Sequence, residues 1–290
     1  MPTISVAGMR VTALNRSALL SAVQTRLHNH IPTRIVTPYS EFLFRAMHDS
    51  AFRDTLNSAD FALPDGVGIL WASTFLSTPL TARTAFGTWV QAIGQMVWTG
   101  ATIVLCPSRI AQIIPEVISG SDFVFDLCKL AVQEQAPIFI AGGFGEVPKK
   151  TAQILQERFP GLKIAGTSNV FVDTITGPAA QSLVETIRTS QARMLFLALG
   201  PYKQELFMMH HWESLQVDLA IGLGGTFDYI TGKSRLAPDW LQKLGLEWLF
   251  RLIAEPYRAP RIYRATVGLI TTLIRYKVQL WTKKSATGTL

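Results

Sequence analysis

Met194-Leu195-Phe196-Leu197-Ala198-Leu199-Gly200-Pro201-Tyr202-Lys203-Gln204-Glu205 is the stretch that decides the fold class of this chain. An uncharged apolar run ends at a Gly-Pro pair, and residues that favour a helix follow directly. Short apolar runs bounded by turn residues are typical of strands buried on both faces of a sheet. The stretch therefore predicts a strand at residues 194–199 and a helix at residues 203–215.

The same alternation continues in both directions along the chain. Short apolar runs predict further strands at residues 34–37, 61–63, 137–141, 163–165 and 218–222. Helical patterns occupy roughly residues 40–57, 121–135, 147–159 and 179–190. Strands that alternate with helices imply a mostly parallel sheet covered on both faces. We therefore predict an α/β fold with a Rossmann-like sheet.

Length and composition set the broad class. The chain has 290 residues, and its 48% hydrophobic content is ample for a large core. Cys106 and Cys128 form neither a CxxC nor a Cys/His pattern, so the sequence predicts neither a zinc site nor a disulfide framework. Arg10 and Arg16 interrupt the apolar runs near the N-terminus, which argues against a signal peptide. We expect a protein that faces the cytosol.

The positive charge is concentrated near the C-terminus. The net charge is +7, and residues 256–290 contain seven basic residues and no acid. Aromatic and aliphatic residues are interleaved with these charges, a pattern typical of a basic amphipathic helix on an anionic membrane. A surface helix docked on the core is the alternative. Nucleic-acid binding is disfavoured because no recognisable binding module accompanies the charge.

Residues 84–108 contain no charged side chain, although Gln91, Gln95 and three glycines interrupt the apolar run. The favoured interpretation is an in-plane or re-entrant membrane hairpin. A buried core helix and a membrane-spanning helix remain open as alternatives. We divide the chain into an α/β core at residues 1–240, with an apolar and possibly membrane-inserted segment at residues 84–115, and a C-terminal appendage at residues 241–290.

Glycines and polar side chains follow the predicted strands, where open α/β proteins bind ligands. The candidate residues at these strand ends are Thr37, Asp65, Gly142, Gly143, Gln204, Glu205, Gly224, Gly225, Thr226 and Asp228. Free amides in the loop at Gly142 and Gly143 would suit a phosphate, with a tight structural turn as the competing explanation. The loop lacks a full GxGxxG pattern, so binding of NAD is a remote alternative.

An ordered set of motifs resembles one known family over roughly residues 5–265. The motifs are Thr37-Pro38, Leu56-Asn57-Ser58-Ala59-Asp60, Leu63-Pro64-Asp65-Gly66-Val67-Gly68, Gly120-Ser121-Asp122, Gly142-Gly143, Phe159-Pro160-Gly161-Leu162-Lys163-Ile164, Ala198-Leu199-Gly200-Pro201 with Lys203-Gln204-Glu205, residues 222–228, and Gly245-Leu246-Glu247-Trp248-Leu249 with Arg251 and Glu255-Pro256. The set resembles the WecG/TagA/CpsF glycosyltransferases.

The resemblance implies a bacterial inverting glycosyltransferase. Such an enzyme moves a hexose or an N-acetylhexosamine from a UDP-sugar to a saccharide on undecaprenyl diphosphate, in the synthesis of a surface polysaccharide. It also implies a Rossmann-like fold, no metal and no cofactor, and the chain contains no DxD motif. The expected location is the cytoplasmic face of the bacterial inner membrane. The oligomeric state stays open.

The resemblance also assigns roles to residues. Asp65 corresponds to the base that accepts the proton of the acceptor hydroxyl, and Thr37 would orient the acceptor or Asp65. Arg83 would bind the diphosphate, with Arg109 as its substitute. Arg251, Arg258 and Arg261 keep the family's spacing of seven and then three residues, and they would bind the diphosphate or lipid head groups.

The other strand-end residues have weaker assignments. Gln204, Glu205, Thr226 and Asp228 would hold uridine or the donor sugar, with helix capping as the competing explanation. Tyr39 stands where the family usually has Asn. If the family arginine is aligned just after Glu116 instead of at Arg83, this chain has Val117 in its place. These departures motivate an alternative function, a catalytically lapsed membrane scaffold that binds nucleotide or lipid.

Overall fold

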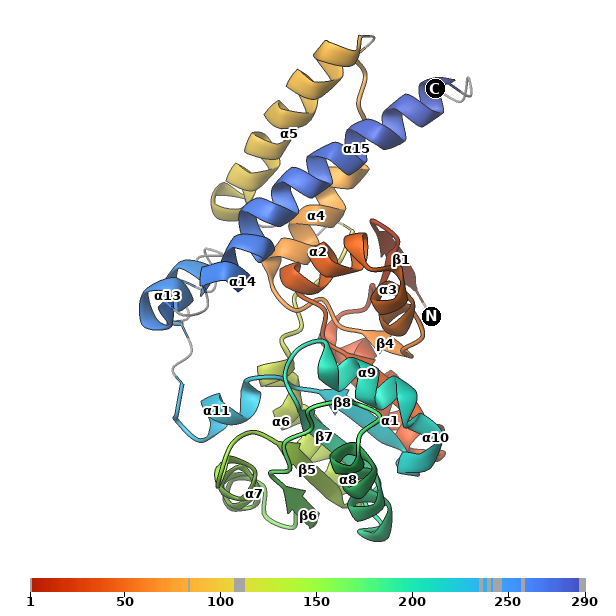
Figure 1. Cartoon of the computed structure of the whole chain (residues 1–290), viewed down its shortest axis with the longest axis vertical. Coiled ribbons are helices and arrows are strands. Elements are labelled where there is room, and N and C mark those ends of the chain that lie inside the picture. The colour runs from red at the N-terminus through yellow and green to blue at the C-terminus, as the bar shows by residue number, and fades with distance from the viewer. Residues whose placement is uncertain are drawn as a thin grey trace.

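The computed structural model describes residues 2–82, 84–106, 113–234, 237–238, 241, 247–256 and 259–286. Its centre is a six-stranded parallel sheet with the order β4-β3-β8-β7-β5-β6 (Figure 1). The strands are β3 (Thr33–Val36), β4 (Phe61–Ala62), β5 (Ile138–Gly142), β6 (Ile164–Ser168), β7 (Met194–Ala198) and β8 (Leu219–Gly222). The six strands predicted from sequence and their parallel arrangement are confirmed.

Helices cover both faces of this sheet. One face carries α2 (Ser40–His48), α3 (Ser50–Asn57), α8 (Pro178–Thr189), α9 (Lys203–His210) and α10 (Trp212–Leu215). The other face carries α1 (Arg16–His28), α6 (Gly120–Gln133), α7 (Val147–Arg158) and α11 (Thr226–Ile230).

Each face has its own hydrophobic core because side chains alternate along a strand. In β5, Ile138 and Ile140 pack in the core of the α6 and α7 face. Phe139 and Ala141 pack in the core of the α8 and α9 face. A strand buried on both sides needs apolar residues at every position, which is why these strands are continuous apolar runs in the sequence.

Two predicted helices are each divided in the structure. The helix predicted at residues 40–57 ends at His48 and restarts at Ser50. Asp49 causes the break, because its carboxylate accepts a hydrogen bond from the Phe52 amide at 3.0 Å and so caps α3. The helix predicted at residues 203–215 is likewise divided at His211 into α9 and α10.

Four elements in the N-terminal part of the chain lie outside the sequence prediction. Strands β1 (Thr3–Val6) and β2 (Met9–Thr12) form an antiparallel hairpin. Its two turn residues, Ala7 and Gly8, both have positive φ, as a tight two-residue hairpin turn requires. The helices α1 and α4 (Val67–Ser77) are the other two additions.

A helical lobe projects from the α/β core. We use this name for α4, α5 (Ala85–Leu105) and α15 (Leu269–Ala286). The last two helices lie side by side and extend away from the sheet (Figure 1). The C-terminal chain reaches α15 through α13 (Glu247–Ala254), α14 (Ala259–Tyr263) and a π-helical segment, η3 (Arg264–Gly268).

The lobe corrects two expectations. Residues 85–105 form one continuous helix, so the hairpin expected within residues 84–108 is wrong. Across the described ranges, no helix combines the length and the hydropathy needed to cross a bilayer. Lys277, which the charge pattern placed on the surface, is buried, and its ammonium donates hydrogen bonds to the Phe75 carbonyl and to Gln95 Oε1.

Candidate functional site

The parallel sheet brings the predicted strand-end residues to one edge. Thr37 follows β3, Asp65 follows β4, Gly143 follows β5, Gln204 follows β7 and Gly224 follows β8. Because all carboxyl ends of parallel strands lie at the same edge, these residues form a row along it. Neighbouring strands are about 4.8 Å apart, so the row from β4 to β5 is about 19 Å long. That length suits an elongated ligand.

Asp65 lies in a turn that the two outermost strands fix. Its amide donates to the Pro38 carbonyl at 3.0 Å, which links the loop after β4 to the loop after β3. The next residue, Gly66, has a φ of 92° and precedes α4 directly. This left-handed conformation suits glycine, which explains the Asp-Gly order of the motif. The side chain of Asp65 is half-buried at the start of α4.

Thr37 contacts the end of β8 and the start of α6. Its hydroxyl donates to the carbonyl of Gly222 at 3.1 Å, and the residue is buried. A Cβ added at Gly120 would lie 3.1 Å from Thr37 Cγ2, so α6 begins directly against this side chain. Thr37 therefore joins β3, the end of β8 and the start of α6. Contact of its hydroxyl with Asp65 or with an acceptor stays a prediction.

Three helices begin around Asp65. The side chain of Ser40 in α2 lies where a Cβ on Gly68 of α4 would be, and the amide of Ile118, just before α6, donates to the Pro64 carbonyl at 3.0 Å. The amino ends of α2, α4 and α6 therefore meet at the carboxyl ends of β3 and β4. Helix amino ends carry unpaired amides and a partial positive charge, which favours anions such as phosphate.

Gln204 and Glu205 lie beneath the glycine loop after β8. The amide of Gly224 donates to Gln204 Oε1 at 3.0 Å, and Gln204 Nε2 donates to Glu205 Oε1 at 2.8 Å. Both side chains are almost completely buried. In this position they hold residues 222–225 in place. Direct contact of either side chain with a substrate stays a prediction.

Glu205 has a buried carboxyl group of which one oxygen, Oε1, accepts a side-chain hydrogen bond. Its Oε2 is buried without a hydrogen-bond partner among the described residues. Burial raises the pKa of Glu205 to about 7, against the hydrogen bond from Gln204, which lowers it. The carboxyl group therefore changes its protonation near neutral pH.

Thr226 and Asp228 differ in exposure. The Thr226 hydroxyl donates to the Leu223 carbonyl at 2.6 Å, within the turn that leads into α11. Gly225 holds the N-cap position of α11, so the capping role weighed against ligand binding is wrong at Thr226. Asp228 keeps a partly exposed carboxylate 3.7 Å from the ammonium of Lys233. Of the two, Asp228 is the side chain that a ligand at the sheet edge can reach.

Gly142 and Gly143 have a structural explanation. The amide of Gly143 donates to the Ala198 carbonyl at 3.1 Å, so the prediction of a free amide at this residue is wrong. A Cβ on Gly142 would overlap the same carbonyl group. The loops after β5 and β7 diverge from this close contact to α7 and α9, on opposite faces of the sheet. A crevice at such a point is the usual ligand position in this architecture.

An exposed aromatic pair at the sheet edge was missed in the sequence. Phe144, after β5, and Phe171, after β6, are 71% and 66% exposed, and their rings stack with centroids 6.5 Å apart. The ammonium groups of Lys203 and Lys233 lie 5.0 Å from the Phe171 ring and 5.8 Å from the Phe144 ring. Phe144 directly follows Gly143, and this aromatic residue in a glycine loop was the available signal.

The predicted arginines divide into two groups. Arg83, Arg109 and Arg258 lie outside the described residues, as does the side chain of Arg251 on α13. Arg261 on α14 is described, and its guanidinium donates to Glu41 Oε2 at 2.9 Å and to the Tyr39 hydroxyl at 2.6 Å. This contact places Arg261 beside the loop that carries Thr37.

Tyr39 and Glu41 complete this contact. The Tyr39 hydroxyl donates to Glu41 Oε2 at 2.8 Å, and burial raises the pKa of Tyr39 above its usual range. Arg264 Nη2 also lies 3.4 Å from Glu41 Oε1. We name Tyr39, Glu41 and Arg261 the clasp, because these three side chains tie α14 to the start of α2.

Two surface cavities of the described structure lie apart from most of this row. A depression of about 620 Å³ lies between α8 and α10 and is lined by none of the candidate site residues. A smaller one of about 150 Å³ contains Thr226, Tyr229 and Arg158. Within the described ranges, no three His, Cys, Asp or Glu side chains are grouped to hold a metal ion. Metal independence stays a prediction for the assay.

An open parallel sheet with a row of polar and glycine residues along its carboxyl edge defines a Rossmann-like α/β protein, an architecture that binds its ligands at this edge. The chain belongs to the glycosyl transferase WecG/TagA/CpsF family, whose family model matches residues 4–97 and 85–283. It is therefore a glycosyltransferase, as the motifs predicted. The two matched segments overlap within α5.

Two bacterial relatives extend the comparison. The chain is 27% identical over 263 residues to an N-acetylglucosaminyldiphosphoundecaprenol N-acetyl-beta-D-mannosaminyltransferase of Bacillus spizizenii, covering 88% of this chain and 87% of the relative. It is 29% identical over 239 residues to a protein of the same name from Bacillus subtilis, covering 82% of this chain and 78% of the relative. Each alignment covers more than three quarters of both proteins.

Proposed function

We propose that this protein transfers a sugar from a UDP-sugar to a saccharide carried on undecaprenyl diphosphate, with inversion at the transferred sugar and without a metal. Family membership supports transfer of a sugar. The names of both relatives support an N-acetylglucosaminyl group on undecaprenyl diphosphate as the acceptor. The reaction would take place at a membrane surface, on the cytoplasmic face where we expect the protein.

The observation that carries the proposal is the position of Asp65. This half-buried carboxylate lies at the carboxyl edge of the sheet, at the point where α2, α4 and α6 begin. In a single displacement, Asp65 would accept the proton of the acceptor hydroxyl while the hydroxyl oxygen forms a bond to the anomeric carbon. The bond from that carbon to the UDP oxygen breaks on the opposite side, which inverts the configuration.

The leaving UDP carries negative charge that the protein must stabilise. The amino ends of α2, α4 and α6 are one source of positive potential beside Asp65. Arg83, Arg251, Arg258 and Arg261 are the arginines that we propose for the diphosphate. The partly exposed Asp228 and the exposed pair of Phe144 and Phe171 are the groups that we propose for the donor's sugar and nucleoside along the same edge.

The test is transfer to a defined acceptor by the full-length protein. Candidate UDP-sugars, including UDP-N-acetylmannosamine, are combined with polyprenyl-diphosphate N-acetylglucosamine in detergent, with and without EDTA. We expect product from one donor, unchanged by EDTA. Asp65→Asn should lower the rate by about 10²-fold to 10⁴-fold, as loss of a general base does.

Asp54→Asn is the matched control, because Asp54 is an exposed carboxylate on α3. Its rate should equal that of the unmodified protein, and thermal melts should show that both variants fold. Asp65→Asn with at least a third of the original rate would refute the role of Asp65. Binding of UDP without product from any donor would instead support the scaffold, and loss of product with EDTA would refute metal independence alone.

A further inference from the structure

The polar and apolar sides of α5 are reversed relative to an ordinary surface helix. Thr88, Thr99 and Thr102 are buried, and Thr99 accepts a hydrogen bond from the Trp71 indole at 3.0 Å. Gln91 Oε1 accepts hydrogen bonds from the amides of Thr81 and Ala82, both at 3.0 Å. The side chains able to bond with water are therefore turned toward the protein.

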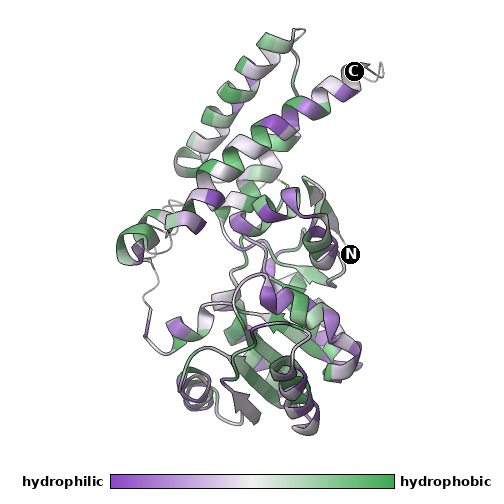
Figure 2. Cartoon of the chain, viewed as in Figure 1, coloured by the Kyte–Doolittle hydropathy of each residue, from purple (hydrophilic) through white to green (hydrophobic). Residues whose placement is uncertain are grey.

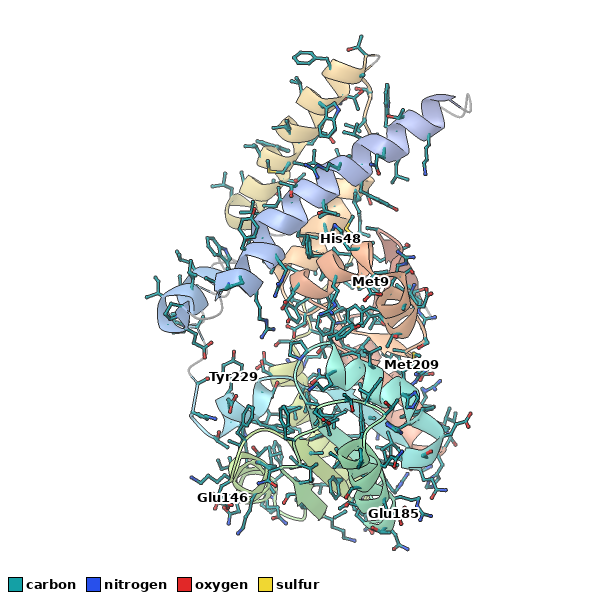
Figure 3. All side chains as sticks on the ribbon, viewed as in Figure 1. Met9, His48, Glu146, Glu185, Met209 and Tyr229 are labelled. Atoms are coloured by element: carbon teal, nitrogen blue, oxygen red, sulfur yellow. The ribbon has the colours of Figure 1, made fainter. Side chains whose placement is uncertain are left out.

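The opposite side of α5 is apolar and uncovered. We define its outer face by the exposed residues Phe86, Trp89, Val90, Ile93, Val97, Trp98 and Leu105. Phe86 is 80% exposed and Trp98 is 61% exposed. No charged side chain of α5 lies beside them, because the helix contains no charged residue. Figure 2 shows this helix as mainly apolar, and in Figure 3 its side chains project from the lobe into open space.

Such a face needs an apolar environment. A helix at the surface of a water-soluble protein normally turns its apolar stripe to the core and its polar side to solvent. A contiguous apolar patch rimmed by polar residues marks an interaction site. We propose that the outer face of α5 docks the protein on an anionic lipid bilayer, with the helix lying in the plane of the interface.

The charges of the lobe favour an anionic lipid surface. The sequence has no acidic residue at positions 66–115 or 257–290, so α4, α5 and α15 contain no carboxylate side chain. Arg275 and Lys283 are exposed on α15, the helix beside α5. Basic side chains next to an apolar face combine electrostatic attraction to anionic lipids with burial of apolar area. The indoles of Trp89 and Trp98 suit the level of the head groups.

The buried side of the lobe explains how α5 keeps this orientation. Gln95 Oε1 accepts a hydrogen bond from the Lys277 ammonium at 2.6 Å, and Gln95 Nε2 donates to the Pro79 carbonyl at 2.8 Å. These bonds connect α5 to α15 and to the loop before α5. Rotation of α5 to hide its apolar face would break them.

The charge of the lobe also argues against a second copy of the chain as the partner that covers the outer face of α5. Two copies joined through this face would bring two cationic lobes together, and like charges across an interface oppose association. One further argument rests on the proposed function, because an acceptor on undecaprenyl diphosphate places the reaction at a bilayer. The reversed polarity of α5 and the absence of carboxylates from α4, α5 and α15 support membrane docking independently of the proposed function.

The experiment is vesicle binding by the full-length protein. Phe86→Gln with Ile93→Gln alters only exposed side chains of the outer face, so the fold should be retained. Ile31→Gln with Met209→Gln is the control, since these two apolar residues are also exposed, at 41% and 44%, but lie outside the lobe. Binding is measured by sedimentation with vesicles of phosphatidylglycerol and phosphatidylethanolamine, and with vesicles of phosphatidylcholine alone.

We expect the unmodified protein to bind the anionic vesicles more tightly than the neutral ones. The α5 double variant should bind the anionic vesicles at least about tenfold more weakly, and the control double variant should bind like the unmodified protein. Brominated lipids should quench the tryptophan emission of the bound protein, and Trp89→Phe with Trp98→Phe should remove most of that quenching.

Equal binding by the two double variants would overturn the inference. A dimer in sedimentation velocity that only the α5 variant loses, with vesicle binding unchanged, would assign the face to a second copy instead. The Asp65→Asn variant distinguishes failure of membrane docking from failure of the proposed function. Its vesicle binding should match that of the unmodified protein whether or not any sugar is transferred.

Discussion

Glu205 holds a carboxyl group where water does not reach it, next to the side chain that positions the loop after β8. Burial raises its pKa from 4.5 to about 7. Between these two pH values the folded protein retains a proton that the unfolded chain has lost. The free energy of unfolding should therefore fall as the pH rises from about 4.5 to about 7, and the penalty is absent below that window.

Glu205→Gln should remove most of this pH dependence. The amide carbonyl of the new side chain still accepts the hydrogen bond from Gln204 Nε2, and it carries no charge at any pH. We expect the urea midpoint of the variant to change less between pH 5 and pH 7.5 than that of the unmodified protein. Glu213→Gln, on an exposed side chain of α10, is the matched control and should keep the original dependence. Equal slopes in all three proteins would contradict the prediction.

At the same scale, the sequence predicted where residues lie, and the structure adds contacts that the sequence did not predict. Asp65, Thr37 and Gln204 were expected at strand ends, and the parallel sheet places them there. The hydrogen bonds of Thr37 to Gly222 and of Gln204 to Gly224 join segments far apart in the sequence. No local pattern contains such contacts, so only the folded chain could show that these side chains hold a loop.

At the scale of elements, buried strands were predictable and local breaks were not. A strand such as β7 is apolar at every position because helices cover both of its faces, and that leaves a clear signal. The hairpin of β1 and β2 was missed because Arg10 interrupts its short apolar runs, although Ala7-Gly8 is the turn signal. The division between α2 and α3 depends on the one capping contact from Asp49.

A close approach of two strands at the candidate site gives another prediction. Gly142 has a φ of 99°, and a Cβ there would overlap the Ala198 carbonyl of β7. Gly142→Ala should therefore destabilise the protein by about 3 kcal/mol, from backbone strain together with forced separation of β5 and β7. The free energy of unfolding in urea measures this loss.

Gly145→Ala is the matched control within the same loop. Gly145 also has positive φ, at 60°, but a Cβ there would meet open space. Its cost should be about 1–2 kcal/mol, from the left-handed conformation alone. A similar cost for the two variants would show that the approach of β5 to β7 does not restrict Gly142.

At the scale of the whole molecule, the C-terminal helices contact both the candidate site and the lobe. Through the clasp, α14 is tied to the loop that carries Thr37. Past the π-helical segment, α15 packs beside α5, whose outer face we propose to lie on the bilayer. One continuous stretch of helix thus connects the proposed membrane face to the carboxyl edge of the sheet. The sequence showed its charges and their spacing, but only the fold shows which neighbours they have.

This connection predicts that the clasp limits water at the site. Glu41→Gln removes the carboxylate that Arg261 and Arg264 share, so α14 should separate more often from the start of α2. An open site admits water, and acceptor-independent release of UDP should rise relative to sugar transfer by about threefold to tenfold, which corresponds to about 1 kcal/mol. Glu157→Gln, on an exposed side chain of α7, should leave the ratio unchanged. If Glu41→Gln also leaves it unchanged, the clasp is only a structural contact and exclusion of water must come from other residues.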